Sequence, residues 1–234
     1  MLMDLHAHSA GISRCCRIPA DEVLRHALAC HIDGIVLTNH YQKCYIEDGN
    51  AAAFAERYIT EFYTAEEFGK QLGCKVFFGV EVTPEFAPNV HLLVYGVEPA
   101  FLREHPCVYD YTLPELYAAV KEHNGLLVQA HPFRNGATVQ DTAYLDGVEV
   151  NCHPIYGKSY CDELLEIAKA NGLLVTCGGD YHADTYRPQC GVFVPDTVDT
   201  MQDLCAYLLA DGEKSICVQE PNEAACSTVC FQQT

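Results

Sequence analysis

The sequence predicts an α/β protein whose strands close, or nearly close, into a barrel. Short apolar runs alternate with amphipathic stretches along the chain, which is the pattern of repeated βα units. Several helical stretches lead through one glycine into an apolar strand, as in HNGLLV, ANGLLV and HIDGIV. The 234 residues, 49% of them hydrophobic, suffice for one core, and α/β barrels of ~250 residues commonly form a single domain. We therefore expect one domain over residues 1–220 and a C-terminal tail over residues 221–234.

The expected strands are apolar runs bounded by turn residues. They cover residues 1–8, 33–40, 74–84, 89–97, 125–132, 146–152, 172–182 and 214–220. Helices are expected between them, at residues 19–31, 50–73, 112–125, 159–172 and 197–212. Pro19 followed by two acids is typical of a helix start, and an Asn-Gly pair at the end of two of these segments is a natural C-cap.

The net negative charge limits the classes of molecule that the protein is expected to bind. The formal net charge is −18, whereas nucleic-acid binding depends on neutralising phosphates with Lys and Arg. We therefore expect no nucleic-acid partner, and the same charge disfavours an anionic membrane surface. We expect no signal peptide and no membrane span, since no apolar run approaches ~18 residues. Fourteen cysteines without a C-x-x-C pair, many in apolar surroundings, indicate reduced thiols in a cytoplasmic protein.

Side chains that bind metals gather at the ends of the expected strands. His6 and His8 lie two residues apart, so in a strand both imidazoles point to the same face. The carboxyl ends of parallel strands meet at one edge, where α/β enzymes build their sites. This pattern predicts a metal site there. The remaining strand-end candidates, of which His91 opens its strand instead of closing it, are His40, Glu81, His91, His131, Glu149, Asn151, Asp180 and His182.

The motifs DLHAHS, LTNHY, GVEVTP, HLLVYG, QAHPFRNG and GGDYH, in this order, resemble those of the PHP (polymerase and histidinol phosphatase) family. The resemblance covers the chain from about Met3 to His182. It implies a distorted (β/α)7 barrel, similar to a TIM barrel, with two or three divalent metals, commonly Zn, Mn or Fe. It also implies that the metals lie at the C-terminal ends of the strands.

The resemblance assigns each metal-binding residue a place. His6, His8 and Asp180 would bind the first metal, and Glu81 would bridge the first metal and the second. The second would be completed by His91 and His131, and a third would be held by His40 and His182. Imidazoles and carboxylates suit Zn²⁺ and Mn²⁺, which is consistent with this assignment. The other histidines are expected to bind no metal: His26, His31, His105, His123 and, in a loop near the site, His153.

Two positions depart from the family pattern. Asn39 stands where many members have Asp, which we expect to alter a hydrogen bond behind the metal ligands. The loop after the first motif usually supplies an Asp or His to the third metal, and here it reads SAGISRCCR. Ser13, Cys15 or Cys16 could replace that ligand, or the two cysteines could be ordinary loop residues. A thiolate at Cys15 would favour zinc.

The expected function is hydrolysis of a small soluble phosphate ester by a metal-bound hydroxide. Glu81 and Asp180 would serve catalysis through the metals, and Arg134, three residues after His131, would contact the phosphate. Three alternatives stay open: histidinol-phosphate hydrolysis, amide or lactone hydrolysis on the same site, and a non-catalytic metal-stabilised module. Further basic residues that could reach the phosphate are Arg14, Lys43 and Arg187.

Overall fold

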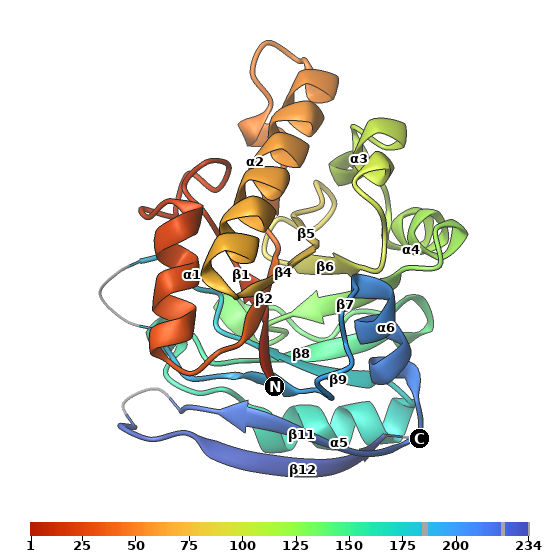
Figure 1. Ribbon diagram of the computed structural model, residues 1–234. Coiled ribbons are helices and arrows are strands. Elements are labelled where there is room, and N and C mark those ends of the chain that lie inside the picture. The colour runs from red at the N-terminus through yellow and green to blue at the C-terminus, as the bar shows by residue number, and fades with distance from the viewer. Residues whose placement is uncertain (184–186, 221–222, 234) are drawn as a thin grey trace.

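A computed structural model describes residues 1–183, 187–220 and 223–233, which fold into strands surrounded by helices (Figure 1). The strands form two six-stranded sheets, with the orders β12-β11-β10-β1-β2-β4 and β3-β5-β6-β7-β8-β9. The α/β class is therefore confirmed. The strands are β1 (Leu2–Ala7), β2 (Gly34–Leu37), β3 (His40–Tyr41), β4 (Lys75–Phe78), β5 (Val80–Val82), β6 (His91–Tyr95), β7 (Leu126–Ala130), β8 (Gly147–Asn151), β9 (Leu174–Gly178), β10 (Gly191–Phe193), β11 (Gly212–Val218) and β12 (Ser227–Gln233).

The closed (β/α)7 barrel is not confirmed, because the strands divide into two sheets. The sheets nevertheless follow one another closely. Strand β2 leads to β3 through two residues, and β4 leads to β5 through Gly79 alone. On the other side, a single parallel bridge joins Ala7, at the end of β1, to Tyr181, which follows β9. Both sheets therefore direct the ends of their strands toward one place.

Strand direction explains the unusual position of His91. Strands β1, β2 and β4 run parallel to one another, as do β7, β8 and β9, so their carboxyl ends share an edge. Strand β6 runs antiparallel to both β5 and β7. Its first residue, His91, therefore lies at the same edge as the last residues of its neighbours.

The helices cover the outer faces of the sheets. Helices α1 and α2 pack side by side over β2 and β4, α4 packs on β7, and α5 packs on β8 and β9. The side chain of Asn50 caps the start of α2 by accepting from the backbone of Ala53, and Gly73 ends this helix in the left-handed conformation. The helices are α1 (Ala20–Ala29), α2 (Ala51–Leu72), α3 (Ala100–Glu104), α4 (Leu113–Glu122), α5 (Cys161–Asn171) and α6 (Met201–Leu209).

Three elements lie outside the expected segments: α3, β10 and β12. Residues 227–233, within the predicted tail, form β12, which pairs with β11 from Ser227 opposite Val218 to Gln233 opposite Gly212.

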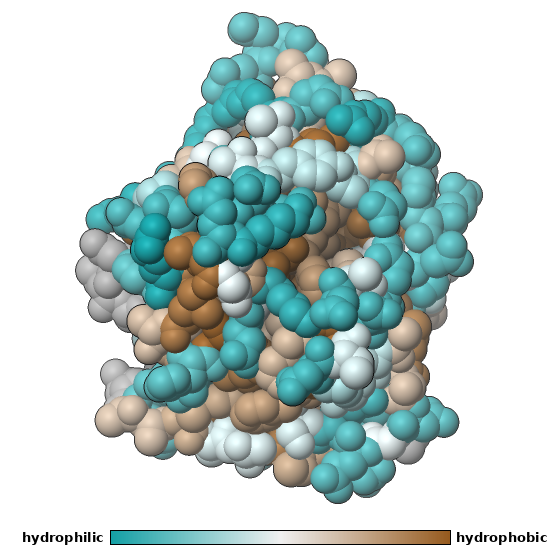
Figure 2. Space-filling model, viewed as in Figure 1, coloured by the Kyte–Doolittle hydropathy of each residue, from teal (hydrophilic) through white to brown (hydrophobic). Residues whose placement is uncertain are grey.

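Within the described ranges, no helix has both the length and the apolar character required to cross a bilayer. Polar side chains cover much of the face in Figure 2, and the apolar surface gathers in its recesses.

One glycine is required beneath the strand ends. A Cβ atom on Gly178 would lie 2.4 Å from the Cβ of His6 and 2.8 Å from Oε1 of Glu149. Any larger residue there would displace both side chains. Gly178 therefore lets β9 pass close behind the imidazole of His6.

Candidate metal centre

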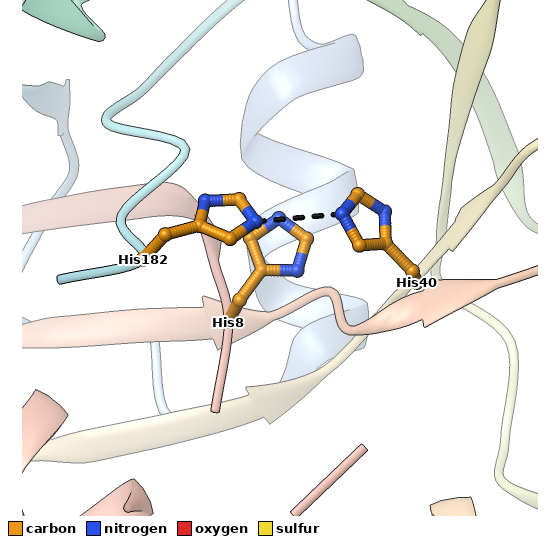
Figure 3. A group of neighbouring side chains, drawn as sticks. All are labelled: His8, His40 and His182. Carbon is orange, nitrogen blue, oxygen red and sulfur yellow. Dashed lines mark hydrogen bonds between the residues drawn. The ribbon is translucent and has the colours of Figure 1, made fainter. Parts of the chain in front are cut away.

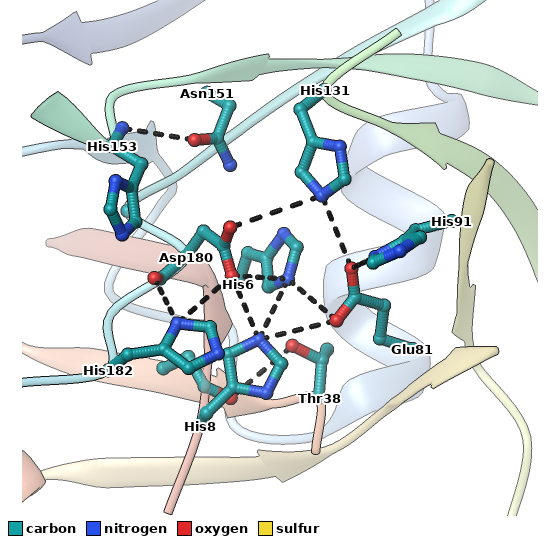
Figure 4. Close-up of polar contacts among 12 residues, drawn as sticks. His6, His8, Thr38, Glu81, His91, His131, Asn151, His153, Asp180 and His182 are labelled. Atoms are coloured by element: carbon teal, nitrogen blue, oxygen red, sulfur yellow. Dashed lines mark hydrogen bonds and ion pairs between the residues drawn. The ribbon is translucent and has the colours of Figure 1, made fainter. Parts of the chain in front are cut away.

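All eight residues predicted to bind metals lie in one cluster at the strand ends, and Figure 4 labels seven of them, all except His40. His6, His8, Glu81 and Asp180 have no exposed surface, and His40 and His131 are 6% exposed. Burial of this many ionisable groups is unfavourable unless they are paired or bind a metal. The cluster therefore requires compensating charge. It contains His6, His8, His40, Glu81, His91, His131, Asp180 and His182.

The innermost group is formed by His6, His8, Glu81 and Asp180. The Nε2 atoms of the two histidines are 3.0 Å apart, and Nε2 of His8 is 3.0 Å from Oδ1 of Asp180. Oε2 of Glu81 lies 3.5 Å from His6 and 3.4 Å from His8. Four donor atoms thus face one point, at separations that fit ligands around a single ion.

The outer partners orient both imidazoles. Nδ1 of His6 is 2.8 Å from Oε1 of Glu149, and Nδ1 of His8 is 3.0 Å from the hydroxyl of Ser13. Ser13 donates its own proton to Oδ1 of Asn39, so it must accept from His8. Nε2 of His8 consequently presents a lone pair to the centre. A hydrogen-bonded outer partner of this kind is the usual support of a metal-ligating histidine.

The protonation of the metal-free cluster shows how much positive charge it requires. Burial lowers the pKa of His6, but the carboxylates of Glu149, Glu81 and Asp180 outweigh it and hold this pKa well above its usual range. Burial, together with the charges of His182 and His40, keeps the pKa of His8 well below its usual value. A proton on one imidazole thus partly balances the carboxylates, and a divalent cation would balance them more fully.

Glu81 connects the innermost group to two further groups. Its Oε1 lies 2.7 Å from Nδ1 of His91 and 3.3 Å from Nε2 of His131, while its Oε2 lies 2.5 Å from Nδ1 of His40. Burial raises the pKa of Glu81, but His40, His91 and His6 outweigh it and hold this pKa well below its usual range. Oε2 and the Nδ1 of His40 are both buried and have one another as a close ion pair. Ligand atoms crowded together in this way fit a set of metal ligands.

The third group contains His8, His40 and His182 (Figure 3). The Nε2 atoms of His40 and His182 are 3.4 Å apart, and their side chains are 8% and 14% exposed. This group is therefore nearer to solvent than the innermost one.

The structure separates the three candidates of the loop SAGISRCCR. The hydroxyl of Ser13 is already hydrogen-bonded to His8, to Asn39 and to the backbone N–H of His40. The thiol of Cys16 is buried and faces the carbonyls of His8 and Ile18.

Of the three, only Cys15 has its side chain against the imidazoles of both His40 and His182. Burial raises the pKa of its thiol, but hydrogen bonds from His182 and His40 outweigh this and lower it to about 6. The thiol also lies 3.8 Å from the hydroxyl of Tyr45.

Of the basic residues predicted to reach the site, only Arg134 does so. Its NH1 lies 3.0 Å from Oδ2 of Asp180 and 3.2 Å from Nε2 of His131. Arg187, which could have reached the phosphate, instead has its guanidinium buried 2.8 Å from Oδ2 of Asp4. Lys43 pairs with Asp110 and Arg14 with Glu47, both on the surface.

Glu149 was a strand-end candidate, but its role in supporting the metal ligands was not predicted. It is completely buried, and besides Nδ1 of His6 it accepts from the backbone of His131 and from Nδ2 of Asn151. It thereby holds two of the predicted ligands in place. The available signal was an acid in the middle of the expected strand DGVEVNC.

The remaining histidines lie in helix α1 or in loops, and His105 and His123 lie together beside Glu104. His26 is in α1, and His31, His105 and His123 follow the ends of α1, α3 and α4. His153 follows β8 and is 8% exposed; burial lowers its pKa to about 4, so the ring is neutral near pH 7.

No protein-family model and no curated protein sequence matches the chain. A Bifidobacterium adolescentis protein, provisionally named a metal-dependent phosphoesterase, matches with TM-score 0.58 and 18% identity over 88% of this chain and 95% of its own. A two-domain Bacteroides vulgatus protein with a predicted PHP-like metal-dependent phosphoesterase matches with TM-score 0.59 and 16% identity, over 99% of this chain but only 64% of its own.

A Chromobacterium violaceum amidohydrolase, solved with sulfate and without metal, matches with TM-score 0.56 and 17% identity over 96% of this chain and 99% of its own. These similarities confirm the PHP-like fold implied by the motifs. They place the chain among folds that serve metal-dependent phosphoesterases and amidohydrolases.

Proposed function

We propose that the protein is a metal-dependent phosphoesterase that hydrolyses a small soluble phosphate ester. The observation that carries this proposal is the convergence of six imidazoles on the carboxylates of Glu81 and Asp180, beside one guanidinium. A cytoplasmic location, a single domain over residues 1–220, and the absence of nucleic-acid and membrane partners belong to the same proposal.

The geometry suggests which residues hold each metal. His6, His8 and Asp180 would bind the first ion, and His91 and His131 the second. Glu81 would bridge them, because its two oxygens face the two groups separately. His40, His182 and Cys15 would bind a third. Bound Zn²⁺, Mn²⁺ or Fe²⁺ would lower the pKa of a water molecule and offset the charge of a phosphoryl group.

The chain's own residues would position the ester. Arg134 stands at the edge of the cluster with its guanidinium against Asp180 and would bind phosphoryl oxygens that develop charge. Glu149 and Ser13 would keep the imidazoles of His6 and His8 in the orientation that ligation requires. Burial of the cluster excludes bulk water, which strengthens each of these contacts.

The structural neighbours support this proposal without deciding the substrate. Two are described as phosphoesterases, and the amidohydrolase binds sulfate, a tetrahedral anion like phosphate. Elemental analysis of the purified protein, together with a panel of phosphate monoesters, diesters, amides and lactones, tests the proposal. Metal-dependent turnover of a phosphate ester supports it. Turnover of amides or lactones alone would favour an amide or lactone hydrolase on the same site. Full metal content without any turnover would favour a non-catalytic, metal-stabilised module.

Arg134→Ala is expected to lower kcat/KM for phosphate esters about 10- to 100-fold, because a charge-assisted contact with the phosphoryl group is lost. The effect on a lactone should be small, since less charge develops there and it lies on the metals. Arg134→Lys keeps the positive charge but loses the planar guanidinium, so its kcat/KM for phosphate esters should fall between those of the native protein and of Arg134→Ala.

Metal content is the control for these variants, because Arg134 also contacts Asp180. An equal loss on esters and lactones, or a parallel loss of metal, would show that Arg134 supports the centre and does not recognise phosphate.

The third metal is expected to be the most exchangeable. His40 and His182 are partly exposed and Cys15 lies in a surface loop, whereas the innermost ligands are completely buried. Titration with EDTA should remove one equivalent at a chelator concentration ~10-fold below that needed for the others. Alkylation of Cys15 by iodoacetamide should become faster at the same step.

Cys15→Ser should remove this metal-dependent alkylation, and Cys44→Ser, which removes another exposed thiol, is its matched control. Departure of all metals in a single step, or alkylation that ignores the metal, would contradict this ranking.

A further inference from the structure

A small cavity of about 240 Å³ opens beside the metal centre. Its walls include His131 and Arg134, which contact Glu81 and Asp180, so one end of the cavity meets the predicted site of chemistry. Its lining also includes Phe133, Ile155, Tyr160 and Leu164. A molecule bound there would touch both residues of the metal centre and apolar side chains.

Two polar groups of the cavity wall are engaged within the protein. Asn151 donates to Glu149 and accepts from the backbone of His153. Ser159 donates to Glu220 through both its hydroxyl and its backbone. These two residues therefore offer a ligand little hydrogen-bonding capacity. The wall also includes the exposed Asn135 and Lys158, whose ammonium pairs with Glu163.

One part of the wall is aromatic and apolar, and the ammonium of Lys158 lies 5.1 Å from the centre of the Tyr160 ring. The rings of Phe133 and Tyr160 have centroids 5.1 Å apart at 59°, within the range of favourable aromatic pairs. Ile155 is 73% exposed at the rim, which is unusual for a large apolar side chain. These surfaces would gain most from contact with a flat apolar group.

The backbone at this cavity is strained. Tyr160 has φ 58° and ψ 30°, a left-handed conformation that is unfavourable for a bulky residue. It also occupies the N-cap of α5 without a side-chain cap, where Ser, Thr, Asp or Asn would stabilise the helix. His131 and Asn135 at the same cavity also have positive φ, of 30° and 50°. Strain of this kind, against local preference, is typical of functional sites.

We propose that this cavity holds the leaving group of the ester, and that the leaving group carries a single aromatic ring seated against Phe133 and Tyr160. The inference rests on the proposed function. The volume lies below the ~300 Å³ at which pockets for drug-sized ligands begin, so one ring fits and a nucleoside does not. In the reaction, the oxygen of water bonds to phosphorus and the ester P–O bond breaks. The products are inorganic phosphate and an aromatic alcohol, which takes up a proton from water.

Benzyl phosphate and cyclohexylmethyl phosphate test this inference, because both release similar alcohols and differ in the ring. With the Mn²⁺-loaded enzyme, we expect kcat/KM for benzyl phosphate to be about fivefold higher. Tyr160→Asn, which suits the left-handed backbone and the N-cap, and Phe133→Leu should each abolish this preference. Tyr63→Leu, an exposed aromatic on α2, is the matched control and should retain it.

Binding of benzylphosphonate, measured by calorimetry, is the readout that does not depend on turnover. Its affinity should exceed that of cyclohexylmethylphosphonate, and Tyr160→Asn should remove the difference. Equal values for both rings, or a preference that survives both substitutions, would overturn the inference while esters are still hydrolysed. If no phosphate ester is hydrolysed at all, the proposed function fails, and the phosphonate affinities decide whether the cavity holds an aromatic ring.

Discussion

Replacing Glu81 with glutamine is expected to abolish metal binding at the first two centres, and activity with it. Glu81 is completely buried, and its two oxygens face His6, His8 and His40 on one side and His91 and His131 on the other. Glutamine has nearly the same shape but no charge, and only its carbonyl oxygen can ligate. The loss should exceed the ~10- to 100-fold caused by removing a partner behind the ligands.

The measurement is metal stoichiometry after dialysis, with kcat on the best ester of the panel. Glu81→Asp keeps the charge but shortens the side chain by one methylene, so it should retain part of the metal. Glu85→Gln makes the same chemical change on an exposed side chain close in sequence and is the matched control. Two equivalents of metal in folded Glu81→Gln would show that Glu81 does not bridge the centres.

The cluster at the strand ends was predictable because topology forces it. Parallel strands place their last residues at one edge, so His6, His131 and Asp180 could be brought together without knowledge of side-chain positions. The position of His91 at this edge was harder to predict, because an apolar run does not reveal that β6 is antiparallel to its neighbours. His91 was included among the ligands because of the resemblance to the family's motifs.

The arrangement of the sheets was less predictable. A closed barrel was expected from repeated βα units, but β10, β11 and β12 extend one sheet as antiparallel strands. Strand β10 has three residues, too few for a periodic signal. Strand β12 lies at the edge of its sheet, groups its polar residues at both ends and has no regular alternation of polar and apolar residues, so its segment resembles a loose tail.

The basic residues show where sequence reasoning ends. Arg134 and Arg187 both follow strand-end motifs, yet one lies at the metal centre and the other is buried beneath it. Long side chains can reach several places from one backbone position, so spacing cannot distinguish them. Glu149 has fewer places to reach, because its side chain is shorter than that of Arg and lies on the buried strand β8. Even so, only the structure shows that it holds His6.

Removal of the Arg187 guanidinium is expected to cost about 3–5 kcal/mol in the free energy of unfolding. Arg187 is 4% exposed and lies 2.8 Å from Oδ2 of Asp4, which is completely buried. The guanidinium also lies 4.3 Å from the centre of the Tyr181 ring, a cation–π contact. Burial raises the pKa of Asp4, and the charge of Arg187 only partly offsets this. Arg187→Ala would therefore leave a buried carboxylate without its cation.

The substitution should also weaken metal binding, because Asp4 positions two of the segments that carry the predicted ligands. Oδ1 of Asp4 accepts from the backbone of His6 and of Gly179, next to Asp180. Urea unfolding in the presence of EDTA measures the stability without the contribution of bound metal. Arg187→Lys retains a charge and should lose less, whereas Arg25→Ala breaks an exposed pair with Asp21 and should change the free energy by less than ~1 kcal/mol.

The pH dependence distinguishes a lost ion pair from lost packing. In Arg187→Ala, the pKa of Asp4 should be higher in the folded state than in the unfolded state, because burial is no longer opposed by a nearby cation. A raised carboxyl pKa destabilises the fold as pH rises above the unfolded value, so the deficit against the native sequence should shrink as pH is lowered toward that value. A deficit that is constant with pH would assign the loss to packing against Tyr181. A deficit below ~1 kcal/mol at pH 7 would show that Asp4 does not depend on Arg187.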